Sequence, residues 1–306
     1  MKIIKYLMEL LEGLLHKDEI YSFGNNYPDK IFYVIRREDI HAGIGSFLIT
    51  NLGYISYAKR KKYIPIIDMK TNKNIYNNNS NINSWELFFQ QPCGYSLNDI
   101  EKAKNVVFSP TFPCRFRPND SMFFYNNTFG YLLYWKKITN SFIFLKNDLH
   151  NSAIKFWEEI SKKNNKILGI FIRGTDYIKM KPSGHPIQPS VEQIIKKIDE
   201  INSKQKFDLY FLVTEDKLIY EKLNKEYGSK LLIYNNSFIN YNGNEYLANS
   251  INVNEAQMHG ENYIKSLLIL SKCQYIVSSR ASGSVVAMLF KEKIKNKYIF
   301  DLGEYK

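Results

Sequence analysis

Short apolar runs alternate with longer amphipathic stretches along most of this chain. In the first half, Ile31–Ile35 and Ile64–Ile67 are predicted to be buried strands, and Phe47–Lys59 between them is predicted to be a helix. Gly43 and Gly45 stand where the first strand turns into that helix. The pattern therefore predicts a strand–loop–helix–strand unit.

The second half repeats the alternation more regularly. Its predicted strands are Ile167–Ile172, Leu209–Val213, Leu231–Tyr234, Tyr275–Val277 and Tyr298–Phe300. Its predicted helices are Ser152–Ile160, Val191–Ile201, the segment from the cap Asp216 to Tyr227, Tyr263–Leu270 and Val285–Phe290. Such alternation implies parallel strands joined by helical crossovers, in a sheet covered on both faces. We predict an α/β fold with two lobes, residues 1–150 and 151–306, divided within Asn140–Asn151.

The amino-acid composition indicates the class of protein, but it does not identify a binding partner. The 306 residues are 44% hydrophobic, as in soluble globular proteins, and no apolar run approaches the roughly 18–20 residues that span a bilayer. The 42 Lys and Arg outnumber the 30 Asp and Glu, which gives a net charge of +12. A field of this sign attracts nucleic acid, membrane phosphates or phosphorylated small molecules, and composition does not choose among them.

The cysteines and the N-terminus bear on the compartment. Cys93, Cys114 and Cys273 are too few and too scattered for a disulfide framework, which favours a reducing compartment. The segment Met1–Leu15 lacks the features of a signal peptide. Its leucines suit a helix packed on the chain's own core, which is the commoner case, or one lying on a membrane surface.

Ligands of open parallel sheets bind beyond the carboxyl ends of the strands, and three predicted strands of the second half end in polar loops. The first loop carries Arg173 and Asp176. Arginine can offer a planar fork of donors to a phosphate, and a carboxylate three residues later can orient the fork. A surface Arg–Asp pair without a ligand explains the same residues equally well.

The other two loops contain groups that suit either a ligand or a helix cap. Glu215 and Asp216 could accept hydrogen bonds from a base or a ribose, although a plain cap is the commoner role for Asp216. The run Ser278–Ser284 places small hydroxyl residues where a helix begins, which suits an anion or a simple cap.

The first half has one candidate loop, with Asp39, His41, Gly43 and Gly45. Leu48 stands where G-x-G-x-x-G requires a third glycine, so the dinucleotide signal is weak, and a solvated loop is the commoner explanation. The sequence contains no G-x-x-x-x-G-K-[ST], H-E-x-x-H, G-x-S-x-G or Asp-x-Asp motif.

Taken together, these loops resemble the donor-binding region of GDP-fucose-dependent fucosyltransferases. The run Gly169–Asp176 followed by His185-Pro186-Ile187 is similar to the α-1,6 enzymes, with the α-1,2 and protein-O-fucosyl enzymes as more distant relatives. Val213–Asp216 matches the family's Ala-Thr-Asp-Asp, Ile264–Ser284 matches its helix, strand and serine-rich turn, and Gly43–Lys59 matches its glycine loop. The resemblance implies a bacterial member with a two-lobed GT-B-like fold and a Rossmann-like C-terminal domain that binds a nucleotide sugar.

The resemblance also implies roles for individual residues. Arg173 would bind the donor's β-phosphate and stabilise the departing GDP. The other residues that it places at the donor are Asp176, His185, Asp216 or less readily Glu215, Ser279, Ser282, Gly43 and Gly45. An acceptor side in the N-terminal lobe would include Trp85 and Glu86, although an aromatic helix of this kind is more commonly core.

Three positions depart from the family. Phe171 replaces a histidine, Gly174 replaces a second arginine, and Lys181 stands where the α-1,6 enzymes have a glutamate proposed as base. The general base is therefore open, with His41 and Asp39 as first candidates because protein-O-fucosyl enzymes place theirs in the corresponding loop, and Glu86 as a third.

The resemblance implies an inverting, metal-independent transfer of fucose or a related sugar to a glycan hydroxyl, in bacterial surface polysaccharide biosynthesis. A GDP-sugar would be the co-substrate, with no cofactor and no metal. We expect a cytoplasmic protein, with peripheral association at the inner face of an anionic membrane as a further expectation. The alternatives are a catalytically inactive relative that binds nucleotide sugars and a basic nucleic-acid-binding protein.

Overall fold

The computed structural model describes residues 18–77, 81–120, 129–235, 238–239, 241, 243, 246–292 and 296–306. The chain divides into two compact units, Met1–Lys146 and Asn147–Lys306, close to the predicted division at 150/151. The predicted amphipathic helix at Met1–Leu15 lies outside the described residues. Within the described residues, no helix is both long enough and apolar enough to cross a bilayer.

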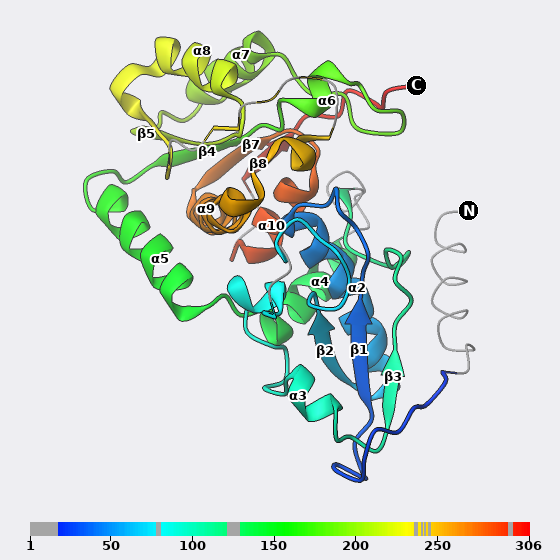
Figure 1. Ribbon diagram of the computed structural model, residues 1–306. Coiled ribbons are helices and arrows are strands. Elements are labelled where there is room, and N and C mark those ends of the chain that lie inside the picture. The colour runs from blue at the N-terminus through cyan, green and yellow to red at the C-terminus, as the bar shows by residue number, and fades with distance from the viewer. Residues whose placement is uncertain are drawn as a thin grey trace. The chain divides into compact units, whose positions relative to one another are not determined.

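The first unit is built on a small parallel sheet of order β2-β1-β3 (Figure 1). Its elements are β1 Phe32–Arg36, α2 Ile44–Lys61, β2 Ile64–Asp68, a 3-10 turn Ser84–Leu87, α3 Leu97–Ile100, β3 Val106–Phe108 and α4 Phe129–Phe142. Helix α2 begins three residues before the predicted start, directly after Gly43, and it ends at Lys61 because Lys62 adopts the left-handed conformation of a C-cap.

The second unit contains a parallel sheet of order β6-β5-β4-β7-β8. Its strands are β4 Ile167–Phe171, β5 Leu209–Val213, β6 Leu231–Leu232, β7 Tyr275–Ser278 and β8 Lys297–Ile299. Its helices are α5 Asn147–Ser161, α6 Asp176–Lys179, α7 Val191–Asn202, α8 Lys217–Tyr227, α9 Val253–Lys272 and α10 Ser282–Phe290, with 3-10 turns at Gly228–Lys230 and Leu247–Ser250.

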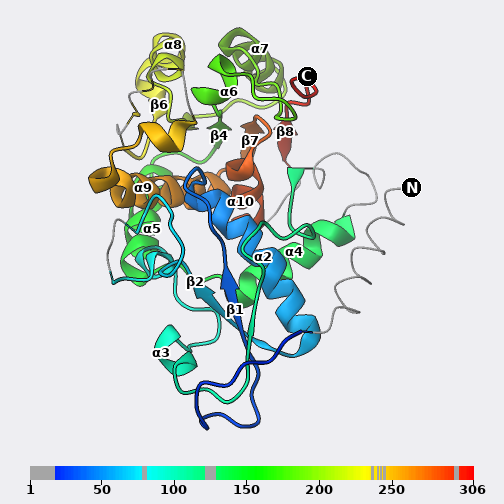
Figure 2. The ribbon, with the colours of Figure 1, turned by 45° about the vertical axis from the view of Figure 1, so that its right-hand side comes forward.

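Helices cover both faces of this sheet, as predicted. Leu168 and Ile170 of β4 point into a core that α7 and α8 complete with residues such as Ile198 and Leu223. Helix α9 contacts β4 and β5, and it lies with α10 on the opposite face (Figures 1 and 2). The strands are consequently apolar on both sides, which is why they appear in the sequence as unbroken apolar runs.

Several elements differ from their predicted bounds. Helix α9 begins at Val253, ten residues before the predicted Tyr263, because the side chain of Asn252 caps it by accepting the N–H of Asn254 at 3.1 Å. Strand β6 has two residues, not the predicted four at Leu231–Tyr234. Strand β3 and helix α4 were not predicted from the sequence.

Candidate donor site

Arg173 lies at the carboxyl end of β4, in the middle of the second sheet. The neighbouring strands β5 and β7 run parallel to β4, so the loops that follow all three strands emerge at the same edge. These loops bring Arg173, Glu215 and Ser279 together, although they are far apart in sequence. This edge is therefore where the candidate donor site is found.

The guanidinium of Arg173 is held by two carboxylates and one aromatic ring. It forms an ion pair with Glu215, and its Nη2 lies 3.1 Å from the carboxylate of Asp176. The guanidinium carbon lies 5.3 Å from the centre of the Tyr177 ring. The side chain of Arg173 keeps 19% of its surface exposed, and the two carboxylates hold its fork of N–H donors in a fixed orientation.

The electrostatics of this cluster are dominated by burial and by the two ion pairs. Burial works against the charge of Arg173, but Glu215 and Asp176 outweigh it and raise the pKa of the guanidinium above its ordinary value. Burial also raises the pKa of Glu215, with Asp176 adding to the rise and Arg173 opposing it. The cluster thus contains one cation, Arg173, and two carboxylates, those of Asp176 and Glu215.

The loop that carries Arg173 is fixed by hydrogen bonds from three directions. The backbone N–H of Arg173 donates to Ser279 Oγ at 3.1 Å, and the N–H of Thr175 donates to Asp216 Oδ2 at 3.0 Å. Asp176 in turn accepts the N–H of Leu247 at 3.2 Å. These bonds hold Thr175 at a φ of 51°, a conformation that is costly for a non-glycine residue and is retained where the surroundings enforce it.

Gly174 is explained by the packing of this loop. A Cβ at this position would lie 2.6 Å from both Cβ and Oδ2 of Asp216. The arginine that the fucosyltransferase pattern has here would therefore strike the cap of α8. Glycine at this position is therefore a steric requirement of the loop.

Asp216 caps helix α8, which was the commoner of the two roles considered for it from the sequence. Its Oδ1 accepts the N–H groups of Leu218 and Ile219, at 2.9 and 3.3 Å, and so caps α8. Its other oxygen anchors Thr175. The predicted contact of Asp216 with a guanine or ribose stays a prediction.

Burial describes two further residues at this edge. Ser279 is fully buried, and its hydroxyl accepts the backbone N–H of Arg173, so it positions the arginine, while its predicted place at the donor stays a prediction. Phe171 is 2% exposed and packs on Gly283, where an added Cβ would lie 2.5 Å from its ring. The position where the family has histidine is therefore part of the core. Ser282, the first residue of α10, is half-buried and stays a candidate.

His185 is connected to the cluster through Tyr177. The two rings meet edge to face, with centroids 5.1 Å apart, and Tyr177 also contacts Arg173. The carbonyl of His185 accepts the N–H of Tyr305, which ties this loop to the C-terminal segment. His185 thus lies beside the Arg173 cluster, and its predicted role at the donor stays a prediction.

The first unit has a comparable cluster at the carboxyl end of β1, in which Asp39 was a predicted candidate and Arg37 was not. Arg37 pairs with Asp39, and its Nη1 donates to Ser46 Oγ at 3.1 Å and to Thr50 Oγ1 at 3.0 Å. Asp39 also accepts the N–H of His41 at 2.9 Å. The signal that could have found Arg37 is its place directly after a buried strand.

The predicted glycine loop differs between its two glycines. Gly43 is exposed at the N-cap of α2, whereas Gly45 is buried inside the first turn. The N–H of Ile44 between them donates to Tyr76 Oη at 2.8 Å. His41 is exposed. The predicted roles of Gly43, Gly45, His41 and Asp39 stay predictions.

Trp85 has the core position that was given as the commoner role of its segment. It is fully buried, stacks on Phe89 with ring centroids 4.3 Å apart, and donates its Nε1–H to the carbonyl of Gln90 at 3.1 Å. Its predicted contact with an acceptor stays a prediction. Glu86 is half-buried and accepts hydrogen bonds from Asn83 and Gln91, at 3.3 and 2.9 Å.

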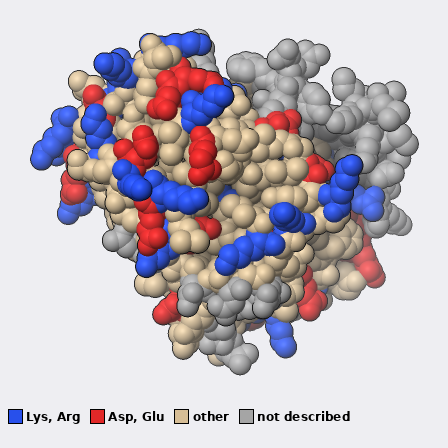
Figure 3. Space-filling model, turned by 90° about the horizontal axis from the view of Figure 1, so that it is seen from above, with Lys and Arg blue, Asp and Glu red and all other residues tan. Residues whose placement is uncertain are grey.

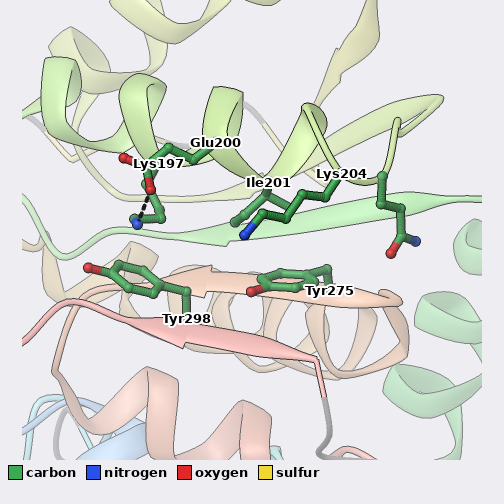
Figure 4. Close-up of a pocket in the computed structure, with 7 residues that line it drawn as sticks. Lys197, Glu200, Ile201, Lys204, Tyr275 and Tyr298 are labelled. Carbon is green, nitrogen blue, oxygen red and sulfur yellow. Dashed lines mark hydrogen bonds and ion pairs between the residues drawn. The ribbon is translucent and has the colours of Figure 1, made fainter.

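A small cavity of about 220 Å³ lies elsewhere in the second unit, beside Tyr275 at the amino end of β7. Figure 4 shows Tyr275 and Tyr298 on one side of it, and Lys197 and Ile201 of helix α7, with Lys204 just beyond the end of that helix, on the other. Lys197 is paired with Glu200 and lies 4.3 Å from the ring centre of Tyr298. None of the predicted site residues lines this cavity.

The surface charge is mixed on the face that α7 and α8 form. Figure 3 shows Lys and Arg side chains there interspersed with Asp and Glu. Lys222 of α8 lies 3.7 Å from Glu192 of α7, and Lys217 lies 3.7 Å from Glu221. This face therefore gives no support to binding of nucleic acid. Among the described residues, no three His, Cys, Asp or Glu side chains form a group suited to a metal ion.

Sequence comparison identifies no relative of this chain. No family model matches it, and no curated protein matches its sequence. Solved structures do match its fold. A structure of NodZ α-1,6-fucosyltransferase soaked with GDP-fucose superposes with a TM-score of 0.51 and 15% identity, over 86% of this chain and 93% of that chain.

Two further structures match to a similar degree. A mutant of FUT1 from Arabidopsis thaliana in complex with GDP has a TM-score of 0.50 and 11% identity, over 95% of this chain and 74% of that chain. POFUT1 in complex with GDP has a TM-score of 0.50 and 10% identity, over 87% and 98%. The predicted GT-B-like α/β class is confirmed, and the chain has the fold of these fucosyltransferases.

Proposed function

We propose that this chain is a glycosyltransferase that moves fucose, or a related sugar, from a GDP-sugar to a hydroxyl group of a glycan. The fold supports the proposal, because the structures that match it include a transferase soaked with GDP-fucose and two proteins in complex with GDP. Fold alone does not assign an activity, so the argument depends on the site.

The observation that carries the proposal is the position of Arg173 at the carboxyl edge of the sheet, with its guanidinium oriented by Glu215 and Asp176 and its side chain partly exposed. The diphosphate leaves with the nucleotide, so negative charge grows on its β-phosphate as the glycosidic bond breaks. A guanidinium that is already oriented stabilises that charge without reorganising during the reaction. This role needs no metal ion, and metal independence is part of the proposal.

The transfer also needs a base that takes the proton of the acceptor hydroxyl, and the inverting course is part of the proposal. Asp39 and His41 are its candidates: Asp39 is ionically paired with Arg37, and His41 is exposed. Glu86 is a third, less suited because its carboxylate already accepts two hydrogen bonds. A role in bacterial surface polysaccharide synthesis at the cytoplasmic face of a membrane completes the proposal.

The test is ligand-dependent stabilisation followed by turnover. GDP should raise the melting temperature of the wild-type protein, and a DNA oligonucleotide should not. In the variant Arg173→Ala, the shift caused by GDP and the transfer of fucose to a glycan panel should both be lost. Lys222→Ala, which removes an exposed cation on α8, is the control that should keep both. Wild-type turnover in Arg173→Ala would refute the assignment, and a steeply salt-dependent shift with the oligonucleotide would favour a nucleic-acid-binding protein.

A second candidate is an inactive relative that binds nucleotide sugars. It is favoured by Phe171 and Gly174, because two polar groups of the family's donor loop are replaced here by core and by a bare backbone. The same experiment separates the two candidates. Stabilisation by GDP that depends on Arg173, without hydrolysis or transfer from any GDP-sugar, would support the inactive relative.

A further inference from the structure

The guanidinium that would bind the donor is already engaged by two protein carboxylates. Asp176 and Glu215 both contact Arg173, so the cluster carries one negative charge in excess when both are ionised. The diphosphate of a nucleotide sugar would add two more negative charges beside them. Like charges at this distance disfavour each other's ionised forms. One of the two carboxylates is therefore expected to change its protonation state when the diphosphate binds.

The two carboxylates are not equally able to respond. The side chain of Asp176 is 3% exposed, and it accepts the N–H groups of Tyr177 and Leu247 in addition to its contact with Arg173. Glu215 is 22% exposed, and within the part of the chain that the structure describes its side chain accepts a hydrogen bond from Arg173. Asp176 is thus fixed as the permanent counter-ion of Arg173, and Glu215 is the group free to change.

We propose that Glu215 is a proton-linked specificity residue of this site: its carboxylate occupies Arg173 in the free protein, and it takes up one proton from solvent when a nucleotide-sugar diphosphate binds there. This inference rests on the proposed function. The protonated carboxyl is neutral, and its O–H can donate to a phosphate oxygen. Glu215 thereby discriminates against small anions that contact Arg173 too weakly to drive the protonation.

The surroundings of Glu215 favour this change. Burial already raises the pKa of its carboxyl group in the free protein, and the charge of Asp176 acts in the same direction. The groups that oppose protonation are Arg173 and, from helix α9, His259, which itself lies 3.7 Å from Glu255. Tyr177 of α6 and Tyr263 of α9 act on the charge of Arg173. A bound diphosphate would pair with Arg173. The charge of Arg173 would then oppose protonation of Glu215 less strongly.

The test measures binding of GDP-fucose by calorimetry at pH 6, 7 and 8, in buffers of different ionisation enthalpy. Its diphosphate is esterified at both ends and takes up no proton in this range. Wild-type protein should bind with uptake of close to one proton, and its affinity should fall by up to about tenfold for each pH unit. Glu215→Gln should take up none, should bind with little pH dependence, and should bind more tightly than wild type at pH 8.

Two control variants keep the result specific to Glu215. Glu221→Gln makes the same chemical change in an exposed pair on α8 and should behave like wild type. His259→Gln should retain the proton uptake, because the proton is assigned to Glu215. Loss of the uptake in His259→Gln would overturn the proposal.

The remaining outcomes distinguish failure of the Glu215 proposal from failure of the proposed function. If Glu215→Gln shows the pH dependence of wild type, or binds more weakly at every pH, the proposal is wrong while the proposed function stands. If neither wild type nor Glu215→Gln binds GDP-fucose, the proposed function and this inference fall together.

Discussion

Two arginines, Arg37 and Arg173, follow buried parallel strands in the two units, and each pairs with an aspartate two or three residues later. The side chain of Arg37 is 7% exposed, and its other partners are the hydroxyl groups of Ser46 and Thr50 on α2. Arg173 is 19% exposed, and its other partners are Glu215 and the Tyr177 ring, at the carboxyl edge of the sheet.

The difference shows how similar local patterns acquire different roles. Helix α2, which follows β1, presents the hydroxyl groups of Ser46 and Thr50 to Arg37, so the guanidinium joins helix to strand. Arg173 instead pairs with carboxylates of two loops, at Asp176 and Glu215, and its guanidinium lies at the carboxyl edge of the sheet. We infer that Arg37 serves stability and Arg173 serves the ligand.

The largest expected effect is on transfer in Arg173→Lys. Lysine keeps the charge but loses the planar fork, so GDP-fucose-dependent transfer should fall by at least about 100-fold. The melting temperature without ligand should change little. A fall of less than about threefold in initial rate would show that Arg173 does not contact the leaving group.

Arg37→Met should mainly lower the stability of the protein, whereas Arg173→Lys mainly lowers the rate of transfer. It leaves Asp39 without its cation and removes the bonds to Ser46 and Thr50, so the free energy of unfolding should drop by about 3 kcal/mol. Urea denaturation followed by circular dichroism measures this change. A loss below about 1 kcal/mol would contradict the structural role given to Arg37.

Gly174→Ala sharpens the comparison at the Arg173 loop. The new methyl group would press on Asp216, so we expect a loss of about 1–3 kcal/mol in the free energy of unfolding, together with weaker GDP binding. Gly130→Ala on α4 is the matched control, because an added Cβ there has open space. Equal stability of the two variants would mean that the loop relaxes freely.

The smallest expected effect is on the pH dependence of stability. Burial raises the pKa of Glu215 in the folded protein, so the folded state binds more protons than the unfolded state between the two pKa values. The free energy of unfolding of the wild-type protein should therefore decrease as the pH rises between these two pKa values. In Glu215→Gln this decrease should be absent. Unfolding free energies at pH 4 and pH 7 test this, and an equal change in both proteins would contradict it.

Local signals predicted the elements of the second unit well. Strand β5 has the predicted bounds, and α8 runs from its cap at Asp216 to Tyr227 with Gly228 after it. Both depend on neighbouring residues, an apolar run in one case and cap and stop residues in the other. Strand β3 was missed because three residues are too short a run to show periodicity.

The sequence by itself determined the alternation of strands and helices, and the pairing of Arg173 with Asp176 three residues away, because both follow from short-range spacing. Only the tertiary structure decided that Glu215, 42 residues from Arg173, would pair with it, and that Ser279, 106 residues away, would hold its backbone. The order of parallel strands in a sheet fixes which loops meet, and no local pattern of residues contains that order.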